Sequence, residues 1–280
     1  DTALYGRESA REQLRRGFAR ARTGQGQVIL LTGEAGIGKT RLVSELIEEL
    51  EREGTDSHYL FGSYAPSAGV GESGAFLDAY RGFLGESEFE EGLADYLADA
   101  PLLQAPLRAL LAGRVESTGA NRASFDLVQR ALVQLTQAIA ASRPTLIWID
   151  DLHFASNEGR DLFAALAQAA SSQALLLVGT ARPVLPADWC ANLLRLEHAS
   201  ELPVPRLEEA DVRRLLAEAL ASPPIAEEMT PSLIQRSDGN PLFLLEYLRA
   251  LGASGTLEAG ELDQAQRRLS EISTPGSVQR

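Results

Sequence analysis

The chain has 280 residues, of which 45% are hydrophobic and 23% charged, and this composition excludes disorder along its whole length. Such a length predicts about two domains. The formal net charge of −13 disfavours an extended nucleic-acid interface, because acidic residues repel a phosphate backbone. A single cysteine, Cys190, excludes an internal disulfide and predicts a reducing, cytoplasmic setting.

The sequence gives no sign of a membrane segment. No apolar run approaches the roughly 20 residues of a membrane-spanning helix, and the first residues lack the layout of a signal peptide. We therefore expect no membrane partner. The chain does not begin with Met, from which we expect that it is part of a longer polypeptide with further domains.

Short apolar runs predict the strands of a parallel sheet. The first covers 27–32, and a glycine-rich turn leads from it into an amphipathic helix over 39–53. Further strands are predicted at 57–62, 145–150 and 174–180. The last two are apolar throughout, which is typical of a parallel sheet covered on both faces.

Helical patterns lie between these strands. They are predicted at 124–141 and 156–170, with Ser124 and Ser156 as N-caps, and short helices are expected in an insertion at about 65–120. This alternation predicts an α/β fold with a three-layer αβα core around the parallel sheet.

After residues 203–206 the strand patterns stop and helical ones follow. A helix is predicted over 207–220, and two more are expected to open at Pro231 and Pro241, since proline is tolerated at the first helical position. The tail from about residue 253 is polar enough to be a linker. We therefore expect two domains, an α/β core at 1–202 and a small α-helical lid at 203–280 that ends in the start of a linker to a downstream domain.

Residues 33–40, Gly-Glu-Ala-Gly-Ile-Gly-Lys-Thr, fit the phosphate-loop pattern GxxxxGK[ST] between the first strand and its helix. The glycines let successive N–H groups converge on phosphate oxygens at the positive end of the helix. Lys39, the only lysine of the chain, would reach the β and γ phosphates, and the Thr40 hydroxyl would hold Mg²⁺. The residues expected to contact the nucleotide here are Ala35, Gly36, Ile37, Gly38, Lys39, Thr40 and Arg41.

Acidic and basic residues follow two later strands. Asp150 and Asp151 end the strand at 145–150, as in a Walker B motif, and would bind Mg²⁺ and activate the attacking water respectively. Arg182 follows the strand at 174–180 and would face the γ phosphate, because a guanidinium binds phosphate bidentately. The alternatives are a strand that ends in ordinary turn residues and a surface arginine before a proline. His153 could polarise Asp151, but a histidine in a loop is more often a neutral hydrogen-bonding residue.

Taken with Leu4-Tyr5-Gly6-Arg7-Glu8 and Gly239-Asn240-Pro241-Leu242, these motifs resemble the ordered motifs of the STAND class of AAA+-related P-loop ATPases. The similarity extends to the nucleotide-binding modules of MalT- and LuxR-type bacterial regulators and of some bacterial adenylate cyclases, over about residues 4–275. The resemblance implies that Tyr5, Gly6 and Arg7 line the adenine and ribose end and that Pro241 presses on the base. Phe154-Ala155-Ser156 departs from the family's usual Trp-Ala-Asp.

The resemblance implies a switch that is closed around ADP and opened by exchange for ATP, with Mg²⁺ and slow hydrolysis. Its expected partners are effector domains of the same polypeptide, in transcriptional regulation or cyclase signalling, and a nucleotide-dependent homo-oligomer, without direct nucleic-acid binding. The alternative is an AAA+ motor or loader that remodels protein or DNA, but Asp151 stands where such proteins normally have Glu. A metabolic kinase has no recognisable acceptor-binding pattern in its favour.

Overall fold

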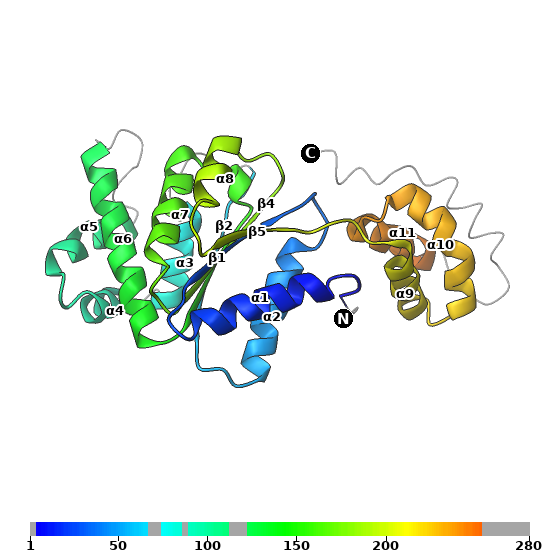
Figure 1. The fold of residues 1–280 in the computed structure, drawn as a ribbon, viewed down its shortest axis with the longest axis horizontal. Helices are drawn as coiled ribbons and strands as arrows, with labels where there is room; N and C mark the ends of the chain where they lie inside the picture. Colours follow the sequence, from blue (N-terminus) through cyan, green and yellow to red (C-terminus); the bar gives the residue numbers. More distant parts are fainter. Residues whose placement is uncertain (1–3, 67–73, 86–88, 112–121, 254–280) are drawn as a thin grey trace. The chain divides into compact units, whose positions relative to one another are not determined.

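The computed structural model describes residues 4–66, 74–85, 89–111 and 122–253 (Figure 1). They divide into two compact units. The helical unit comprises 4–12, 33–42 and 203–253, and the sheet unit comprises 13–32 and 43–202, within the described residues. The segment with the phosphate-loop pattern therefore belongs to the same unit as the last helices of the chain.

The sheet unit contains a five-stranded sheet with the order β2-β3-β4-β1-β5. The strands β1, β2, β3 and β4 pair in parallel. All residues of β1, β3 and β4 are buried, which confirms the prediction of a parallel sheet covered on both faces. The strands are β1 (Gln27–Thr32), β2 (His58–Ser63), β3 (Thr145–Asp150), β4 (Leu175–Ala181) and β5 (Ala199–Pro203).

Helices cover both faces of this sheet. A Cβ at Gly17 in α1 would lie 2.8 Å from Ile29 and 3.5 Å from Leu176, and one at Gly179 would lie 2.9 Å from Phe163 in α7. Leu176 and Gly179 are three residues apart in β4, so they face opposite sides of the sheet and place α1 and α7 on opposite faces. The α/β fold with three layers is confirmed.

The helices of this part of the chain include the short ones expected in the insertion. They are α1 (Glu8–Ala21), α2 (Lys39–Arg52), α3 (Gly74–Leu84), α4 (Phe89–Tyr96), α5 (Pro101–Leu111), α6 (Arg122–Ser142), the 3-10 turn η1 (Leu152–Phe154), α7 (Asn157–Ala169) and α8 (Ala187–Leu193). None of the described helices combines the length and hydrophobicity needed to cross a bilayer.

The two serine N-caps have different outcomes. Ser156 precedes α7 and accepts a hydrogen bond from the Gly159 N–H at 3.1 Å, so this prediction is confirmed. Ser124 lies inside α6, which begins at Arg122, and the prediction that it caps this helix is wrong. Arginine and alanine are strong helix formers, so the helix extends over Arg122 and Ala123 before it reaches the serine.

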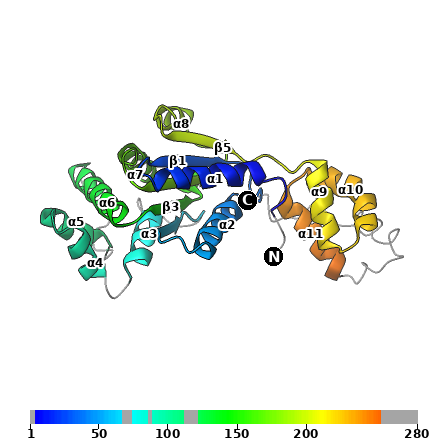
Figure 2. The same ribbon diagram turned by 60° about the horizontal axis from the view of Figure 1, so that its bottom comes forward.

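The helical unit contains α9 (Glu209–Ala219), α10 (Pro223–Ser237) and α11 (Pro241–Ala253), which lie together in Figures 1 and 2. Buried side chains of all three helices, among them Leu216, Met229 and Leu244, form a core of their own. The prediction that a helix opens at Pro231 is wrong, because this proline lies inside α10. The helix opens at Pro223, where a missing N–H costs no hydrogen bond, and the packing of its buried face continues the helix past Pro231.

Candidate functional site

The phosphate loop, residues 33–40, curls around the side chain of Lys39. Gly36 and Gly38 have φ values of 73° and 100°, a left-handed conformation that glycine adopts without strain. Only 7% of the residue Lys39 is exposed, and its ammonium group donates hydrogen bonds to the carbonyl oxygens of Gly33 and Glu34, both at 2.9 Å. Helix α2 begins at Lys39, so the loop combines glycine-permitted curvature, one buried cation and a helix N-terminus. This combination suits a phosphate group.

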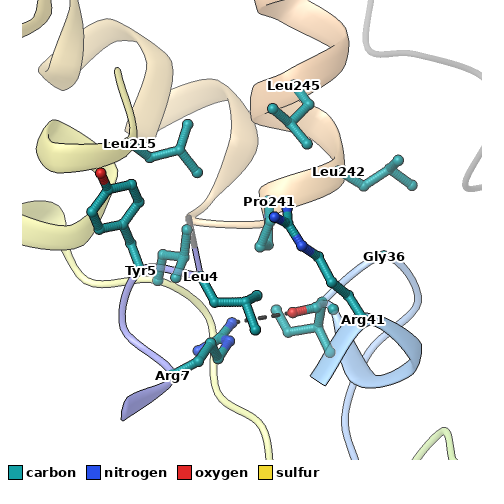
Figure 3. Close-up of a pocket in the computed structure, with 12 residues that line it drawn as sticks. Leu4, Tyr5, Arg7, Gly36, Arg41, Leu215, Pro241, Leu242 and Leu245 are labelled. Carbon is teal, nitrogen blue, oxygen red and sulfur yellow. Dashed lines mark hydrogen bonds between the residues drawn. The ribbon is translucent and has the colours of Figure 1, made fainter. Parts of the chain in front are cut away.

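A cavity of about 150 Å³ lies beside this loop, within the helical unit (Figure 3). Its wall contains the predicted residues Tyr5, Arg7, Gly36, Ile37, Gly38, Arg41 and Pro241. The structure thus brings together the N-terminal segment, the phosphate loop and the start of α11, which are far apart in the sequence. The rest of the wall is apolar and was not predicted, and it consists of Leu4, Leu207, Leu215, Leu242 and Leu245.

Arg7 joins the N-terminal segment to the phosphate loop. Only 3% of the residue is exposed, and its guanidinium donates to the carbonyl oxygen of Ile37 at 3.2 Å (Figure 3). It also donates to the carbonyl oxygen of Gly6 at 3.1 Å. Burial lowers the pKa of Arg7, and the carboxylates of Asp211 and Glu8 act in the opposite direction. Because an arginine keeps its proton at neutral pH, it places a buried positive charge in the cavity wall.

The other predicted residues of this unit have different positions. The Tyr5 hydroxyl is hydrogen-bonded to Glu218, which raises the pKa of Tyr5, and the Arg214 guanidinium lies 5.0 Å from the Tyr5 ring centre. Gly6 has a φ of 65° and does not line the cavity, and a Cβ there would lie 2.4 Å from Asp211. Ala35, Lys39 and the exposed Thr40 are also outside the cavity wall.

Asp150 lies at the end of β3 in the sheet unit and is 6% exposed. The hydroxyl of Thr180, on the neighbouring strand β4, donates a hydrogen bond to its carboxylate and accepts the Asp151 backbone N–H at 3.0 Å. A carboxylate held in this way supplies hard oxygen atoms of the kind that Mg²⁺ prefers. Thr180 was not among the predicted residues, although it is the single polar side chain in an otherwise apolar strand, and this signal could have identified it.

Asp151, His153 and Arg182 lie close together in the sheet unit. The Nδ1 atom of His153 is 3.8 Å from an Asp151 carboxylate oxygen and accepts the Arg182 backbone N–H at 3.4 Å. An Nδ1 that accepts this N–H cannot at the same time donate to Asp151. The Arg182 guanidinium lies 5.8 Å from the Phe154 ring centre, at the position that departs from the family pattern.

Comparisons with known proteins agree with this fold. The model of the AAA ATPase domain family matches residues 3–178. An uncharacterized protein of Rhizobium meliloti is 25% identical over 273 residues, which is 91% of this chain and 25% of that protein. The chain therefore spans about a quarter of the length of this relative.

Two solved structures share the fold at low sequence identity. A Drosophila ORC structure bound to DNA is 15% identical with a TM-score of 0.60, covering 96% of this chain and 61% of that one. A mutant RuvB of Thermotoga maritima is 15% identical with a TM-score of 0.52, covering 96% of this chain and 71% of that one. At this identity the likeness concerns the fold alone.

Proposed function

Because the chain belongs to the AAA ATPase domain family, we propose that it is an ATP/ADP-binding switch of the STAND class with slow Mg²⁺-dependent hydrolysis. The observation that carries the proposal is the cavity beside the phosphate loop, whose wall combines loop residues with residues of α9 and α11. A ligand that contacts both sets of residues can favour one pose of the helices over another, and a change in its phosphate tail then changes which pose is favoured. That is the requirement for a population shift between two poses of the helices.

The residues of the helical unit fit a nucleotide by their chemistry. The apolar wall, with Pro241 and Tyr5, suits the flat face of a base, and Arg7 adds one buried positive charge. The phosphate loop with Lys39 suits the phosphate tail. Contacts of Gly6, Ala35 and Thr40 with the nucleotide remain predictions from the sequence.

The proposed chemistry of hydrolysis rests on the sequence motifs and on the local geometry of the sheet unit. Mg²⁺ would offset the charge of the phosphates, with Thr40 and Asp150 as its protein ligands. Within the described ranges, no three or more His, Cys, Asp and Glu side chains gather in a way that would hold a metal by themselves. We therefore expect Mg²⁺ to be bound together with the nucleotide. Asp151 would orient the attacking water, and Arg182 would sense the γ phosphate.

We further propose that the signal passes to effector domains in the same polypeptide, in transcriptional regulation or cyclase signalling. This chain corresponds to a quarter of its Rhizobium relative, which leaves ample length there for other domains. A nucleotide-dependent homo-oligomer in a cytoplasmic setting is part of the same proposal. The second candidate, a motor or loader, is favoured by the fold shared with RuvB and ORC, while the net charge of −13 disfavours its action on DNA.

Substitution of Lys39 tests nucleotide binding. Lys39→Ala removes the only lysine of the chain, and we expect the affinity for Mg·ATP and ADP to fall about 10- to 100-fold, as for a lost charge-assisted hydrogen bond. Isothermal titration calorimetry measures this change directly. Arg52→Ala, which removes an exposed cation at the other end of α2, is the matched control and should bind like the wild type. Unchanged affinity of Lys39→Ala would contradict the proposed function.

A further inference from the structure

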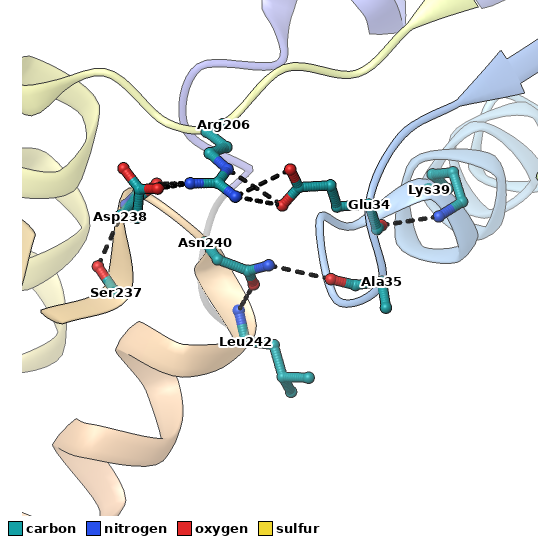
Figure 4. A network of polar contacts seen from close by, with 9 residues as sticks. Glu34, Ala35, Lys39, Arg206, Ser237, Asp238, Asn240 and Leu242 are labelled. Atoms are coloured by element: carbon teal, nitrogen blue, oxygen red, sulfur yellow. Dashed lines mark hydrogen bonds and ion pairs between the residues drawn. The ribbon is translucent and has the colours of Figure 1, made fainter. Parts of the chain in front are cut away.

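Arg206 forms a fork-like ion pair with Glu34 of the phosphate loop (Figure 4). Its Nε lies 3.0 Å from the Glu34 Oε2, and its Nη2 lies 2.8 Å from both Oε1 and Oε2. Several N–H donors thus meet one carboxylate, which makes this contact more directional than a single surface ion pair. Neither the phosphate-loop pattern nor the family resemblance assigns a role to Arg206.

The same guanidinium holds the turn between α10 and α11. Arg206 also pairs with the Asp238 carboxylate and donates from Nη1 to the Asp238 carbonyl oxygen at 3.4 Å (Figure 4). Asp238 has a φ of 50° and caps the end of α10. One arginine therefore connects the phosphate loop to the turn that precedes α11.

The next two residues of the loop contact the start of α11. The Asn240 side-chain amide donates to the Ala35 carbonyl oxygen at 3.0 Å, and its oxygen accepts the Leu242 N–H at 3.0 Å. A Cβ at Gly36 would lie 2.6 Å from the Leu242 Cβ, so a larger residue at position 36 would push the phosphate loop and the start of α11 apart. Three consecutive loop residues thus hold the segment 203–253, and Arg206 supplies the charged contact.

We propose that Arg206 is a positioning residue that fastens segment 203–253 to the phosphate loop and thereby slows the release of bound nucleotide. The inference rests on the proposed function. The cavity is lined by Gly36, Ile37 and Gly38 on one side and by Leu207, Leu215 and Pro241 on the other. A ligand enclosed by both sets leaves when they separate, so the contacts that join them set its residence time.

The exposure of the pair limits its effect and makes it sensitive to salt. The side chains of Arg206 and Glu34 are 40% and 49% exposed. Exposed ion pairs contribute little unless their geometry is close to bidentate, as it is here, so we expect Arg206→Ala to accelerate ADP release by a modest factor of about 3 to 10. Salt screens such a pair. Raising the salt concentration from about 0.1 to 0.5 M should therefore accelerate ADP release from the wild type more than from Arg206→Ala.

The experiment measures the dissociation rate of fluorescent N-methylanthraniloyl-ADP from the 280-residue chain, by stopped-flow displacement with unlabelled ADP. Glu34→Gln removes the charge on the other side of the Glu34 contact and leaves the contact with Asp238. It should accelerate release no more than Arg206→Ala, and the double variant should release no faster than Arg206→Ala. Arg213→Ala is the matched control. Arg213 is 43% exposed and pairs with Glu209 and Glu227 inside the segment 203–253. It should release ADP like the wild type.

The outcomes separate this inference from the proposed function. If Lys39→Ala loses binding while Arg206→Ala and Glu34→Gln release ADP at the wild-type rate, the role of Arg206 is wrong and nucleotide binding stands. Additive effects of the two substitutions, or an equal effect of Arg213→Ala, would also overturn it. If Lys39→Ala binds like the wild type, the proposed function itself is wrong.

Discussion

At the scale of single residues, Asp151, which we propose to orient the attacking water, has an uncommon backbone conformation. Its φ of 55° and ψ of 40° lie in the left-handed region, which Asn and Asp adopt more readily than other residues with a Cβ. Asp151→Asn therefore removes the charge and retains the backbone. We expect nucleotide affinity to stay within about two-fold and ATP turnover to fall at least about 100-fold, as for loss of a general base.

Phosphate release, measured alongside calorimetric binding, checks this expectation. Asp161→Asn, at an exposed position of α7, is the matched control and should hydrolyse ATP like the wild type. Turnover retained by Asp151→Asn would assign the base to another residue. A loss of binding together with turnover would mean that the substitution acts on the structure.

Some site residues could be predicted from the sequence because their spacing is local. The phosphate loop is one continuous segment, and four residues predicted there to contact the nucleotide line the cavity, namely Gly36, Ile37, Gly38 and Arg41. Leu207 and Leu215 could not be identified in this way. An apolar side chain on a helix packs into a hydrophobic core as often as it lines a ligand cavity, and only the tertiary structure shows which of the two it does.

At the scale of elements, the N-cap of α7 offers a measurable contribution to stability. The Ser156 side chain accepts the Gly159 N–H at 3.1 Å, one of the helix donors without a partner inside the helix. Ser156→Ala should lower the free energy of unfolding by about 1 kcal/mol. Urea unfolding followed by circular dichroism measures the change.

Ser222 provides the matched control for this cap. It is the N-cap of α10, but its side chain makes no capping hydrogen bond. Ser222→Ala should therefore leave the urea midpoint unchanged. Equal losses in both variants would mean that serine acts through the intrinsic preferences of the chain and not through the observed hydrogen bond.

Element boundaries were predictable where a strand is a short, continuous apolar run, as in β1 and β3, whose bounds match the prediction. Strand β5 was missed, because Glu201 and Pro203 are typical of an edge strand and give no apolar run. Pro231, by contrast, did give a local signal, and it was wrongly predicted to start a helix. The local rule for proline was correct in general, but the packing of α10 overrides it.

At the scale of the whole molecule, charge distinguishes the switch from a loader that acts on DNA. The chain carries 39 acidic and 26 basic residues, and nonspecific DNA binding requires cations that displace counterions from the phosphates. We expect no binding to a fluorescent DNA duplex up to about 100 µM protein at roughly 0.15 M salt, measured by anisotropy. We also expect the rate of ATP hydrolysis to stay the same when the duplex is added.

If the nucleotide changes the pose of the helices and thereby exposes a local basic surface, DNA binding depends on which nucleotide is bound. The measurement is therefore made with ADP and with a non-hydrolysable ATP analogue. Micromolar binding in either state that weakens steeply with added salt would contradict the proposal, because such a slope counts phosphate contacts. Stimulation of hydrolysis by the duplex would favour the loader. A switch that acts through attached domains should neither bind the duplex nor hydrolyse ATP faster in its presence, and its turnover should be slow. The reason is that its conformational equilibrium is set by the difference in nucleotide affinity between two poses and not by contacts with DNA.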